Sequence, residues 1–245
     1  MPNRRILRLS GADTDSFLQG LVTNDIGGLE DGLVYAALLT PQGKYLADFF
    51  LKREDDAVLL DVAEILAEGL VKRLGMYKLR ADVTIKESGL NLQRGTGPAP
   101  QGALPDPRHV DMGWRAYTAA PESDDGSDWD DIRVRHCIPE TGIELTSDSY
   151  ILESGFELLN GVDFKKGCYV GQEVTARMKH KTELRKGLRR VTVDRSAPVG
   201  TEIFANGKPV GTLFTQSGGA GIAYLRLDRA TGDMQADLAN VGLSD

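Results

Sequence analysis

The spacing of apolar residues changes along the chain, and this change constrains the fold more than any other feature. In the first three quarters, strand-like runs alternate with helix-like stretches, as in Leu33–Thr40, Lys44–Lys52 and the helical spacing from Ile65 to Leu74. After about Leu188 the apolar runs are short, and glycine-rich turns separate them. Short strands at such spacing favour a small barrel. The sequence therefore predicts an α+β body over residues 1–183 and a C-terminal β-barrel over residues 184–245.

Two local signals refine the first part. Pro41-Gln42-Gly43 separates two strand-like runs, so we expect a β-hairpin there. Asp61 is followed three residues later by Glu64, which resembles a capping box at the start of the helix. We expect Asp61 to cap that helix.

Composition excludes several classes of protein. Twenty-nine basic and 36 acidic residues give a net charge of -7, which argues against the broad positive surface of a dedicated nucleic-acid binder. The two cysteines, Cys137 and Cys168, are too few for a disulfide framework. The chain lacks the apolar run of a signal peptide and the ~20 apolar residues of a membrane span. These features predict a reducing, cytoplasmic location without a membrane partner.

The segment from Asp163 to Glu173 concentrates reactive side chains around two glycines. We expect Gly167 and Gly171 to adopt positive φ and to allow close backbone approach, which would leave Cys168 on a tight loop. The neighbouring lysines Lys165 and Lys166 favour the thiolate, the reactive and metal-binding form. The alternative is a buried cysteine that acts as a small apolar residue.

One interpretation of the residues after this loop is a strand from Val174 to Met178. In a strand, Glu173, Thr175 and Arg177 would share one face and bring a carboxylate and a guanidinium together. Gln172 beside them favours a polar pocket, and an ordinary surface ion pair is the alternative.

The octapeptide Lys166-Gly167-Cys168-Tyr169-Val170-Gly171-Gln172-Glu173 resembles the signature of the YgfZ group of folate-binding proteins, which are related to the T-protein of glycine cleavage. Other segments agree in order: Phe17-Leu18-Gln19-Gly20, Thr23-Asn24-Asp25, Leu39-Thr40-Pro41-Gln42-Gly43-Lys44, Tyr77-Lys78-Leu79-Arg80-Ala81-Asp82-Val83 and Asp106-Pro107-Arg108. The resemblance implies a T-protein-like body of intertwined α/β subdomains with a C-terminal barrel. It also implies tetrahydrofolate in a central cavity and a role in iron-sulfur cluster assembly or repair.

The resemblance also implies roles for individual residues. Cys168 and Lys166 would be the catalytic pair, and Glu153 resembles the pterin-contacting carboxylate of T-proteins, although a carboxylate at a helix start is the alternative. Lys44 would meet the anionic tail of folate or serve only the turn. The complete set of cofactor-binding residues predicted in this way is Asn24, Asp25, Lys44, Glu153, Tyr169, Gln172, Glu173 and Arg177; for Asn24 and Asp25 an ordinary turn is the alternative.

One departure and one exclusion remain. Cys137 stands where a glycine is expected in a Gly-Ile-Pro run. The three histidines, His136 and His180 among them, lack the spacing of metal ligands, so no metal site is predicted.

Three functions stay open at this point. The favoured one is a tetrahydrofolate-binding protein that serves iron-sulfur proteins or their assembly machinery. A one-carbon transferase would instead need a carboxylate near the reacting nitrogen and no thiol. A weak tRNA contact is the third, although a solvated basic face is its alternative; it rests on Arg177, Lys179, His180, Lys181, Arg185, Lys186, Arg189 and Arg190.

Overall fold

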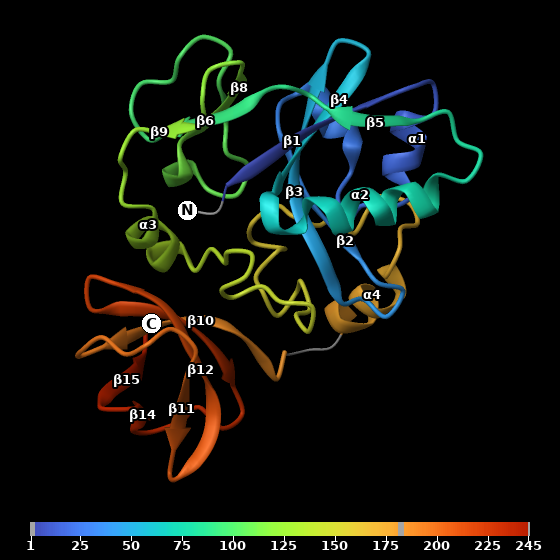
Figure 1. Cartoon of the computed structure of the whole chain (residues 1–245). Helices are drawn as coiled ribbons and strands as arrows, with labels where there is room; N and C mark the ends of the chain where they lie inside the picture. Colours follow the sequence, from blue (N-terminus) through green and yellow to red (C-terminus); the bar gives the residue numbers. More distant parts are fainter. Residues whose placement is uncertain (1–2, 181–183, 245) are drawn as a thin grey trace. The chain divides into compact units, whose positions relative to one another are not determined.

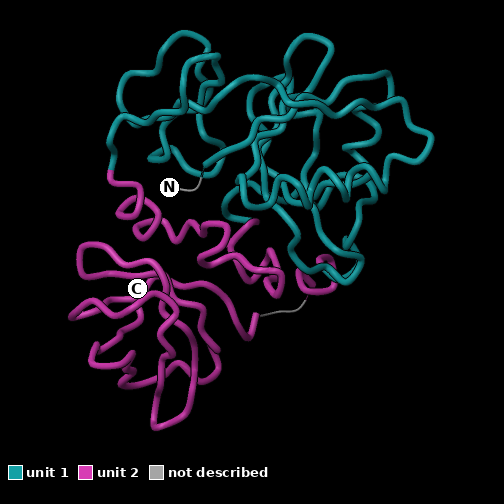
Figure 2. Tube along the Cα trace, in the orientation of Figure 1, with its two compact units in different colours: residues 1–127, 157–174 teal, residues 128–156, 175–245 magenta. Residues whose placement is uncertain are grey.

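A computed structural model describes residues 3–180 and 184–244 and divides the chain into two compact units (Figures 1 and 2). Unit 1 comprises residues 1–127 and 157–174, and unit 2 comprises residues 128–156 and 175–245. Each unit is therefore built from segments that are distant in sequence. The predicted boundary at Glu183 lies outside the described residues and stays a prediction. Within the described residues, no helix has the length and apolar character of a membrane span.

Unit 1 is built around a five-stranded antiparallel sheet. Its strands are β1 (Arg4–Ser10), β2 (Val34–Leu39), β3 (Tyr45–Glu54), β4 (Ala57–Ala63) and β5 (Thr84–Glu87), in the order β2-β3-β4-β1-β5. The predicted hairpin is confirmed, because β2 and β3 pair across the turn that begins at Pro41. Short apolar runs with few polar interruptions form these strands because most of their side chains are buried.

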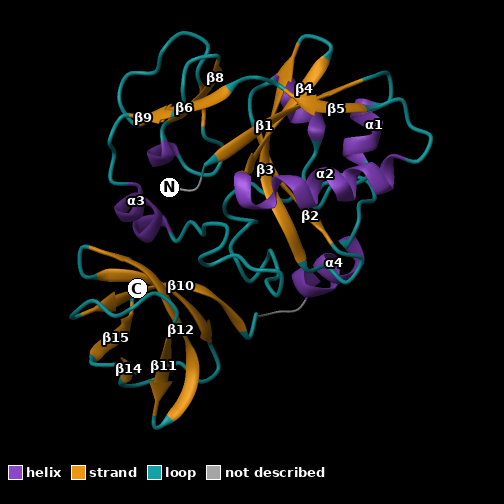
Figure 3. Ribbon diagram, viewed as in Figure 1, coloured by secondary structure: helices purple, strands orange, loops and turns teal. Residues whose placement is uncertain are grey.

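Three helical segments accompany this sheet: α1 (Thr14–Gln19), the 3₁₀ turn η1 (Ile26–Glu30) and α2 (Glu64–Lys78). α2 packs its buried face, Ala67, Leu70 and Leu74, into the core that lines the sheet (Figure 3). The expected helix is confirmed, but the expected capping box is wrong. Ala63 occupies the N-cap without a side-chain hydrogen bond, and Asp61 lies inside β4 with no exposed surface.

A second, four-stranded sheet follows in residues 91–124. It contains β6 (Asn91–Gly95), β7 (Leu104–Pro105), β8 (Trp114–Thr118) and β9 (Ser123–Asp124), in the order β7-β8-β6-β9. The 3₁₀ turn η2 (Val110–Met112) precedes β8. Two of these strands are only two residues long, which explains why prolines and acidic residues hid them in the sequence.

Asp61 joins the two sheets of unit 1. Its carboxylate accepts hydrogen bonds from Arg4 Nε of β1 at 2.6 Å and from Arg115 Nη2 of β8 at 2.5 Å. The hydroxyl of Tyr117, also on β8, donates to the same carboxylate at 2.9 Å. Burial alone raises the pKa of Asp61, but Arg4 and Arg115 outweigh it and lower that pKa to about 2. A buried charge is thus fully compensated by two cations from different sheets.

Unit 2 contains a closed antiparallel barrel of short strands. In barrel order these are β10 (Lys186–Val193), β13 (Ala220–Arg226), β12 (Lys208–Ser217), β11 (Thr201–Ala205), β14 (Met234–Ala236) and β15 (Ala239–Leu243). Small and branched apolar side chains fill its interior. The helix α3 (Trp129–His136) is fixed beside it because Arg133 pairs with Glu144, whose carboxylate also binds the Thr215 hydroxyl.

The Asp61 network makes a prediction for stability. Asp61→Asn should lower the free energy of unfolding by about 3–5 kcal/mol, because it leaves the buried Arg4 guanidinium without its carboxylate and Arg115 with only the 3.4 Å contact to Asp106. Urea unfolding would measure this change. Asp56→Asn is the matched control, since the side chain of Asp56 is 89% exposed, and it should change stability by less than about 0.5 kcal/mol.

The sign of the pH dependence follows from the lowered pKa. Asp61 stabilises the fold fully above its unfolded pKa of 3.8, and this contribution is lost as the pH falls toward about 2. In that pH range the free energy of unfolding of the wild-type protein should fall toward that of Asp61→Asn. A constant difference between the two proteins from pH 5 to pH 2 would contradict the assignment.

Candidate functional site

Lys166 anchors the loop that carries the cysteine, and both lie in unit 1. The Lys166 side chain is buried, and its ammonium donates to the backbone oxygens of Gln19 at 2.8 Å and Val22 at 2.5 Å. The same nitrogen lies 5.2 Å from the centre of the Tyr169 ring. The lysine therefore ties residues 163–171 to the chain between α1 and η1.

Burial governs the charge of this lysine. Desolvation lowers the pKa of Lys166 to about 8, although Asp25 and Asp163 oppose the shift. A group that exchanges its proton near neutral pH is therefore held against two carbonyl oxygens.

Gly171 fixes the other end of the loop. Its φ is +85°, and a Cβ there would come within 2.7 Å of the backbone oxygen of Thr40 and 3.0 Å of the Leu39 side chain. The expectation for Gly171 is confirmed. For Gly167 it is wrong, because Gly167 does not have a positive φ and a Cβ there would meet no atom within 4 Å.

Cys168 lies between these two fixed points and is exposed. The prediction of a thiol on a tight, accessible loop is thus met by the geometry, and the alternative of a buried apolar cysteine is wrong. Tyr169 beside it is 8% exposed and packs into the unit. The chain therefore presents a sulfur atom to solvent from a loop held on both sides.

The expected strand over Val174–Met178 is wrong, because these residues form the helix α4 (Gln172–His180) (Figure 3). Gln, Glu, Ala, Arg, Met and Lys all favour helix, and they outweigh the two β-branched residues. In this helix Glu173 and Arg177 are four residues apart, so they still share a face, while Thr175 is buried. The pairing of a carboxylate with a guanidinium stays a prediction.

Asn24 and Asp25 shape a turn. The Asn24 amide donates to the backbone oxygens of Tyr35 and Asn160, and its own oxygen accepts from the backbone of Asp25. The Asp25 carboxylate accepts from the Gly27 amide and caps η1. The side-chain amide of Asn24 is therefore bonded to backbone atoms, as expected if Asn24 only stabilises an ordinary turn.

Lys44 follows the hairpin turn between β2 and β3. Its backbone amide donates to the hydroxyl of Thr40, and its carbonyl accepts from the amide of Thr40. The side chain is half-buried. The backbone contacts account for the turn and leave the predicted anion contact untested.

Glu153 belongs to unit 2 and is not at a helix start, which rules out that alternative. It lies in a series of turns over residues 151–160 and is half-buried. The Tyr224 hydroxyl of β13 donates to its Oε2 at 2.5 Å, and burial together with this bond raises the pKa of Tyr224. The carboxylate is thus held in place against the barrel.

The ten predicted site residues are divided between the units. Asn24, Asp25, Lys44, Lys166, Cys168, Tyr169, Gln172 and Glu173 lie in unit 1, whereas Glu153 and Arg177 lie in unit 2. In unit 1 the geometry brings together Lys166, Tyr169 and the Asp25 turn around the cysteine loop. Of the basic cluster suggested for RNA, Lys181 lies outside the described residues.

A buried polar group in unit 1 escaped the sequence analysis. The carboxylate of Asp48 accepts from the hydroxyls of Tyr35 at 3.0 Å and Tyr45 at 2.5 Å. The guanidinium of Arg108 stacks 4.8 Å from the centre of the Phe50 ring. The usable signal was an aspartate at position 48 inside an otherwise apolar strand.

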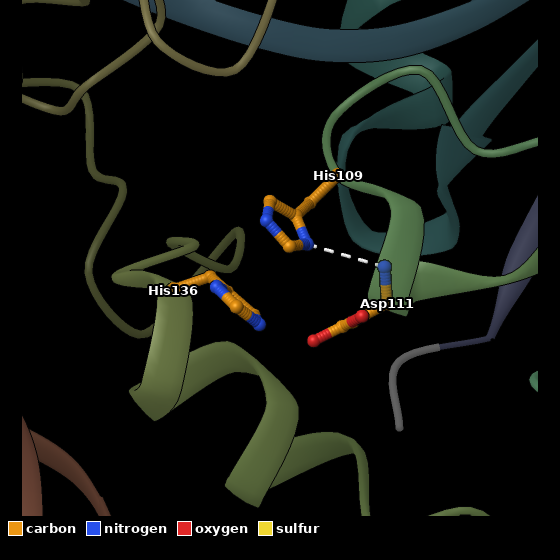
Figure 4. Close-up of side chains that lie close together, drawn as sticks. All are labelled: His109, Asp111 and His136. Atoms are coloured by element: carbon orange, nitrogen blue, oxygen red, sulfur yellow. Dashed lines mark hydrogen bonds between the residues drawn. The ribbon is translucent and has the colours of Figure 1, made fainter.

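Two features of the structure concern the remaining Cys and His residues. Cys137 is the C-cap of α3 in the left-handed region, with φ 52°, which explains why a glycine is expected there; burial raises the pKa of its thiol to about 11. Figure 4 shows His109, whose Nδ1 accepts from the backbone amide of Asp111 at 3.1 Å and caps η2. His136, also labelled there, ends α3 in unit 2. The prediction that the histidines form no metal site stays a prediction.

Comparison with known proteins places this geometry in context. Residues 185–244 match the family model of the CAF17 C-terminal beta-barrel domain. The iron-sulfur cluster assembly factor IBA57 of Mus musculus is 30% identical over 96% of this chain and 78% of its own length, and that of Homo sapiens is 29% identical with the same coverage. The IBA57 homolog of Mycosarcoma maydis is 31% identical over 76% of this chain, but only 54% of its length is covered.

The fold is shared with a solved structure of lower sequence identity. The glycine cleavage system aminomethyltransferase T from Bartonella henselae superposes with a TM-score of 0.74 at 12% identity, over 99% of this chain and 83% of the other. The predicted α+β class, the T-protein-like body and the C-terminal barrel are therefore confirmed.

The predicted cytoplasmic location is wrong. The IBA57 relatives are mitochondrial proteins by name. The prediction failed because a low cysteine count indicates only a reducing environment and does not tell one reducing compartment from another.

The buried lysine makes a prediction for pH dependence. The Lys166 amine loses its proton near pH 8 in the folded protein but only near 10.5 when unfolded. Between these values the unfolded state binds more protons, so stability rises with pH. In this range the free energy of unfolding of the wild type should rise relative to that of Lys166→Met by at most about 1.4 kcal/mol per pH unit. Urea unfolding would measure this difference.

Lys165→Met is the matched control, because Lys165 is the exposed neighbour of Lys166. Its unfolding free energy should follow that of the wild type at every pH. Parallel curves for wild type and Lys166→Met would refute the lowered pKa.

Proposed function

Because the chain belongs to the IBA57 family of iron-sulfur cluster assembly factors, we propose that it acts in iron-sulfur cluster assembly or repair through the Cys168 thiol. Within that family we further propose the finer relation to YgfZ-type folate-binding proteins, which rests on the octapeptide from Lys166 to Glu173. The observation that carries the proposal is an exposed sulfur on a loop held at both ends.

The number of cysteines limits what this sulfur can do. A cluster is usually held by four cysteine thiolates, and the chain has two cysteines in all. Burial raises the pKa of Cys137 to about 11, so Cys137 remains a thiol at neutral pH. Cys168 therefore supplies one thiolate ligand to a cluster substrate, and the remaining ligands come from an iron-sulfur client or from the assembly machinery.

Lys166 acts as a positioning residue in this scheme. The Lys166 ammonium donates two hydrogen bonds to backbone oxygens and so holds the loop in one conformation. The Cys168 sulfur is therefore already in position when a partner binds. Gln172, Glu173 and Arg177 on α4 would present polar groups on the helix that follows the cysteine loop, and Asn24 and Asp25 shape the turn that anchors the lysine.

Tetrahydrofolate is the proposed cofactor, and Glu153 is the residue that fits it best. An ionised carboxylate accepts about four hydrogen bonds, and the Tyr224 hydroxyl uses one of them. Glu153 can therefore accept from the amino group and the ring N–H of a pterin. The contact of Lys44 with a glutamate tail stays a prediction. When bound, a folate supplies a carrier for one-carbon units. The transferase and tRNA hypotheses stay predictions.

The first test removes the sulfur. Cys168→Ser should reduce iron-sulfur enzyme activity, in cells that lack the native protein, to the level of cells without any copy. The hydroxyl is a poor ligand for a cluster, so the loss should occur at unchanged protein abundance, checked by immunoblot.

Cys137→Gly serves as the control for this experiment. It removes the other thiol and places a glycine in a left-handed conformation, so activity should be retained. Full activity of Cys168→Ser would overturn the proposed role of the thiol.

The second test concerns the cofactor. Titration calorimetry with tetrahydrofolate should show saturable binding, and Glu153→Gln should weaken it about 10- to 100-fold, because a charged acceptor is lost. Glu202→Gln is the control, since Glu202 is exposed on the barrel strand β11. Equal affinities for all three proteins would exclude Glu153 as the pterin contact.

A further inference from the structure

The outer face of α2 carries an exposed apolar stripe that no part of unit 1 covers. Ile65 is 74% exposed and Met76 is 62% exposed. With Gly69 and Lys72 between them they occupy positions i, i+4, i+7 and i+11, which fall on one side of a helix, opposite the buried residues Ala67, Leu70 and Leu74. The stripe therefore has the spacing of a helix-packing seam.

The stripe continues one residue past the helix. Leu79 is 88% exposed, and its φ of 45° lies in the left-handed region that a bulky residue normally avoids. A strained and fully exposed leucine gains nothing from the fold of unit 1. Leu79 is therefore a further exposed apolar side chain at the C-terminal end of α2.

A cavity opens beside the stripe. It has a volume of about 200 Å³ and lies between α2 and the strands β2 and β3, where Leu38, Leu46, Leu70 and Arg73 line it with Gly69 and Ile65. Ligand sites for cofactor-sized molecules span about 300–1,000 Å³, so this cavity suits a single apolar side chain better than a folate. Figure 1 shows how the helix α2 crosses the sheet.

Gly69 keeps this cavity open. Glycine is unfavourable inside a helix, and a Cβ at Gly69 would meet no atom within 4 Å, so packing does not require it. The missing side chain leaves a hole at the boundary of the cavity and the stripe. Gly75 in the same helix also has open space, but it does not line the cavity and lies on the opposite flank.

The charge around the hole selects the partner. Along α2 and the three residues after it, the four cations Lys72, Arg73, Lys78 and Arg80 outnumber the carboxylates Glu64 and Glu68, although the whole chain has a net charge of -7. Within the described residues no carboxylate pairs with the side chains of Lys72 or Arg73. An acidic and apolar partner would therefore be complementary to this surface.

We propose that this face of α2 docks an acidic amphipathic helix of a partner protein, with one apolar side chain seated in the cavity at Gly69 and a carboxylate on Arg73. The inference deepens the proposed function and rests on it, because a chain that offers one thiolate needs a partner beside it. A membrane is disfavoured as the occupant, since Gly69 and Lys72 interrupt the apolar stripe and Glu64 and Glu68 lie in the same helix.

The binding test uses the full chain and a synthetic helix of about 18 residues, with leucine on one face and glutamate on the other. Fluorescence anisotropy should show saturable binding that Gly69→Ala weakens about tenfold, because a methyl group narrows the hole, and that Arg73→Gln also weakens. Gly75→Ala should bind as the wild type does. Both alanine variants should raise the melting temperature by about 2 °C, so a loss of binding cannot come from misfolding.

Three outcomes of this test would overturn the proposal. They are equal binding by Gly69→Ala and Gly75→Ala, equal binding of a peptide with lysine in place of glutamate, and binding to anionic phospholipid vesicles with none to the acidic peptide. The last outcome would assign the surface to a membrane.

A cellular arm connects the surface to iron-sulfur assembly. Gly69→Ala should lower iron-sulfur enzyme activity in cells lacking the native protein, while Gly75→Ala should not; equal activity would refute the docking role. Cys168→Ser should still bind the acidic peptide with wild-type affinity. Failure of the thiol hypothesis therefore appears in the Cys168 variant alone, and failure of the docking hypothesis appears in the α2 variants.

Discussion

The carboxylate of Asp61 is the interaction on which unit 1 depends. Two sheets with separate hydrogen-bond ladders meet where this buried anion receives Arg4 from one and Arg115 from the other. The buried carboxylate of Asp61 is tolerated only because both arginines and the Tyr117 hydroxyl bind it. Its pKa is lowered because the arginines outweigh the effect of burial. Burying the network requires both sheets, so neither sheet can hold these residues in place alone.

The same logic operates on a smaller scale at the cysteine loop. Lys166 has lost much of its hydration and has gained two carbonyl oxygens and a ring face. Gly171 allows the backbone to approach Thr40 at a distance that any side chain would forbid. A loop fixed by one desolvated amine and one glycine can leave Cys168 exposed and still give it a defined position. Exposed loop residues usually lack a fixed position, but Cys168 is exposed on a loop that is held at both ends.

Local patterns in the sequence were sufficient for features that depend on neighbouring residues. The hairpin around Pro41, the helix that became α2 and the barrel strands β10 to β13 follow from turn residues and apolar period, whereas β14 and β15 were not predicted. The strand expected at Val174–Met178 was a misreading of local helix propensity, whereas other errors arose where distant residues decide. Asp61 resembled a cap because its arginine partners are remote in sequence, and Gly167 was given the φ that only Gly171 has.

The number of cysteines and the surface of α2 lead to the same requirement. A chain with two cysteines, one of them capping a helix with a raised pKa, cannot supply four thiolates. Under the proposed function, the exposed Cys168 thiol needs a second protein that contributes the other ligands. In that proposal such a protein is held by contacts other than the metal, since a cluster substrate is passed on. An uncovered apolar stripe with unpaired cations, on the helix whose glycine leaves a hole, meets that need through packing and charge rather than through coordination.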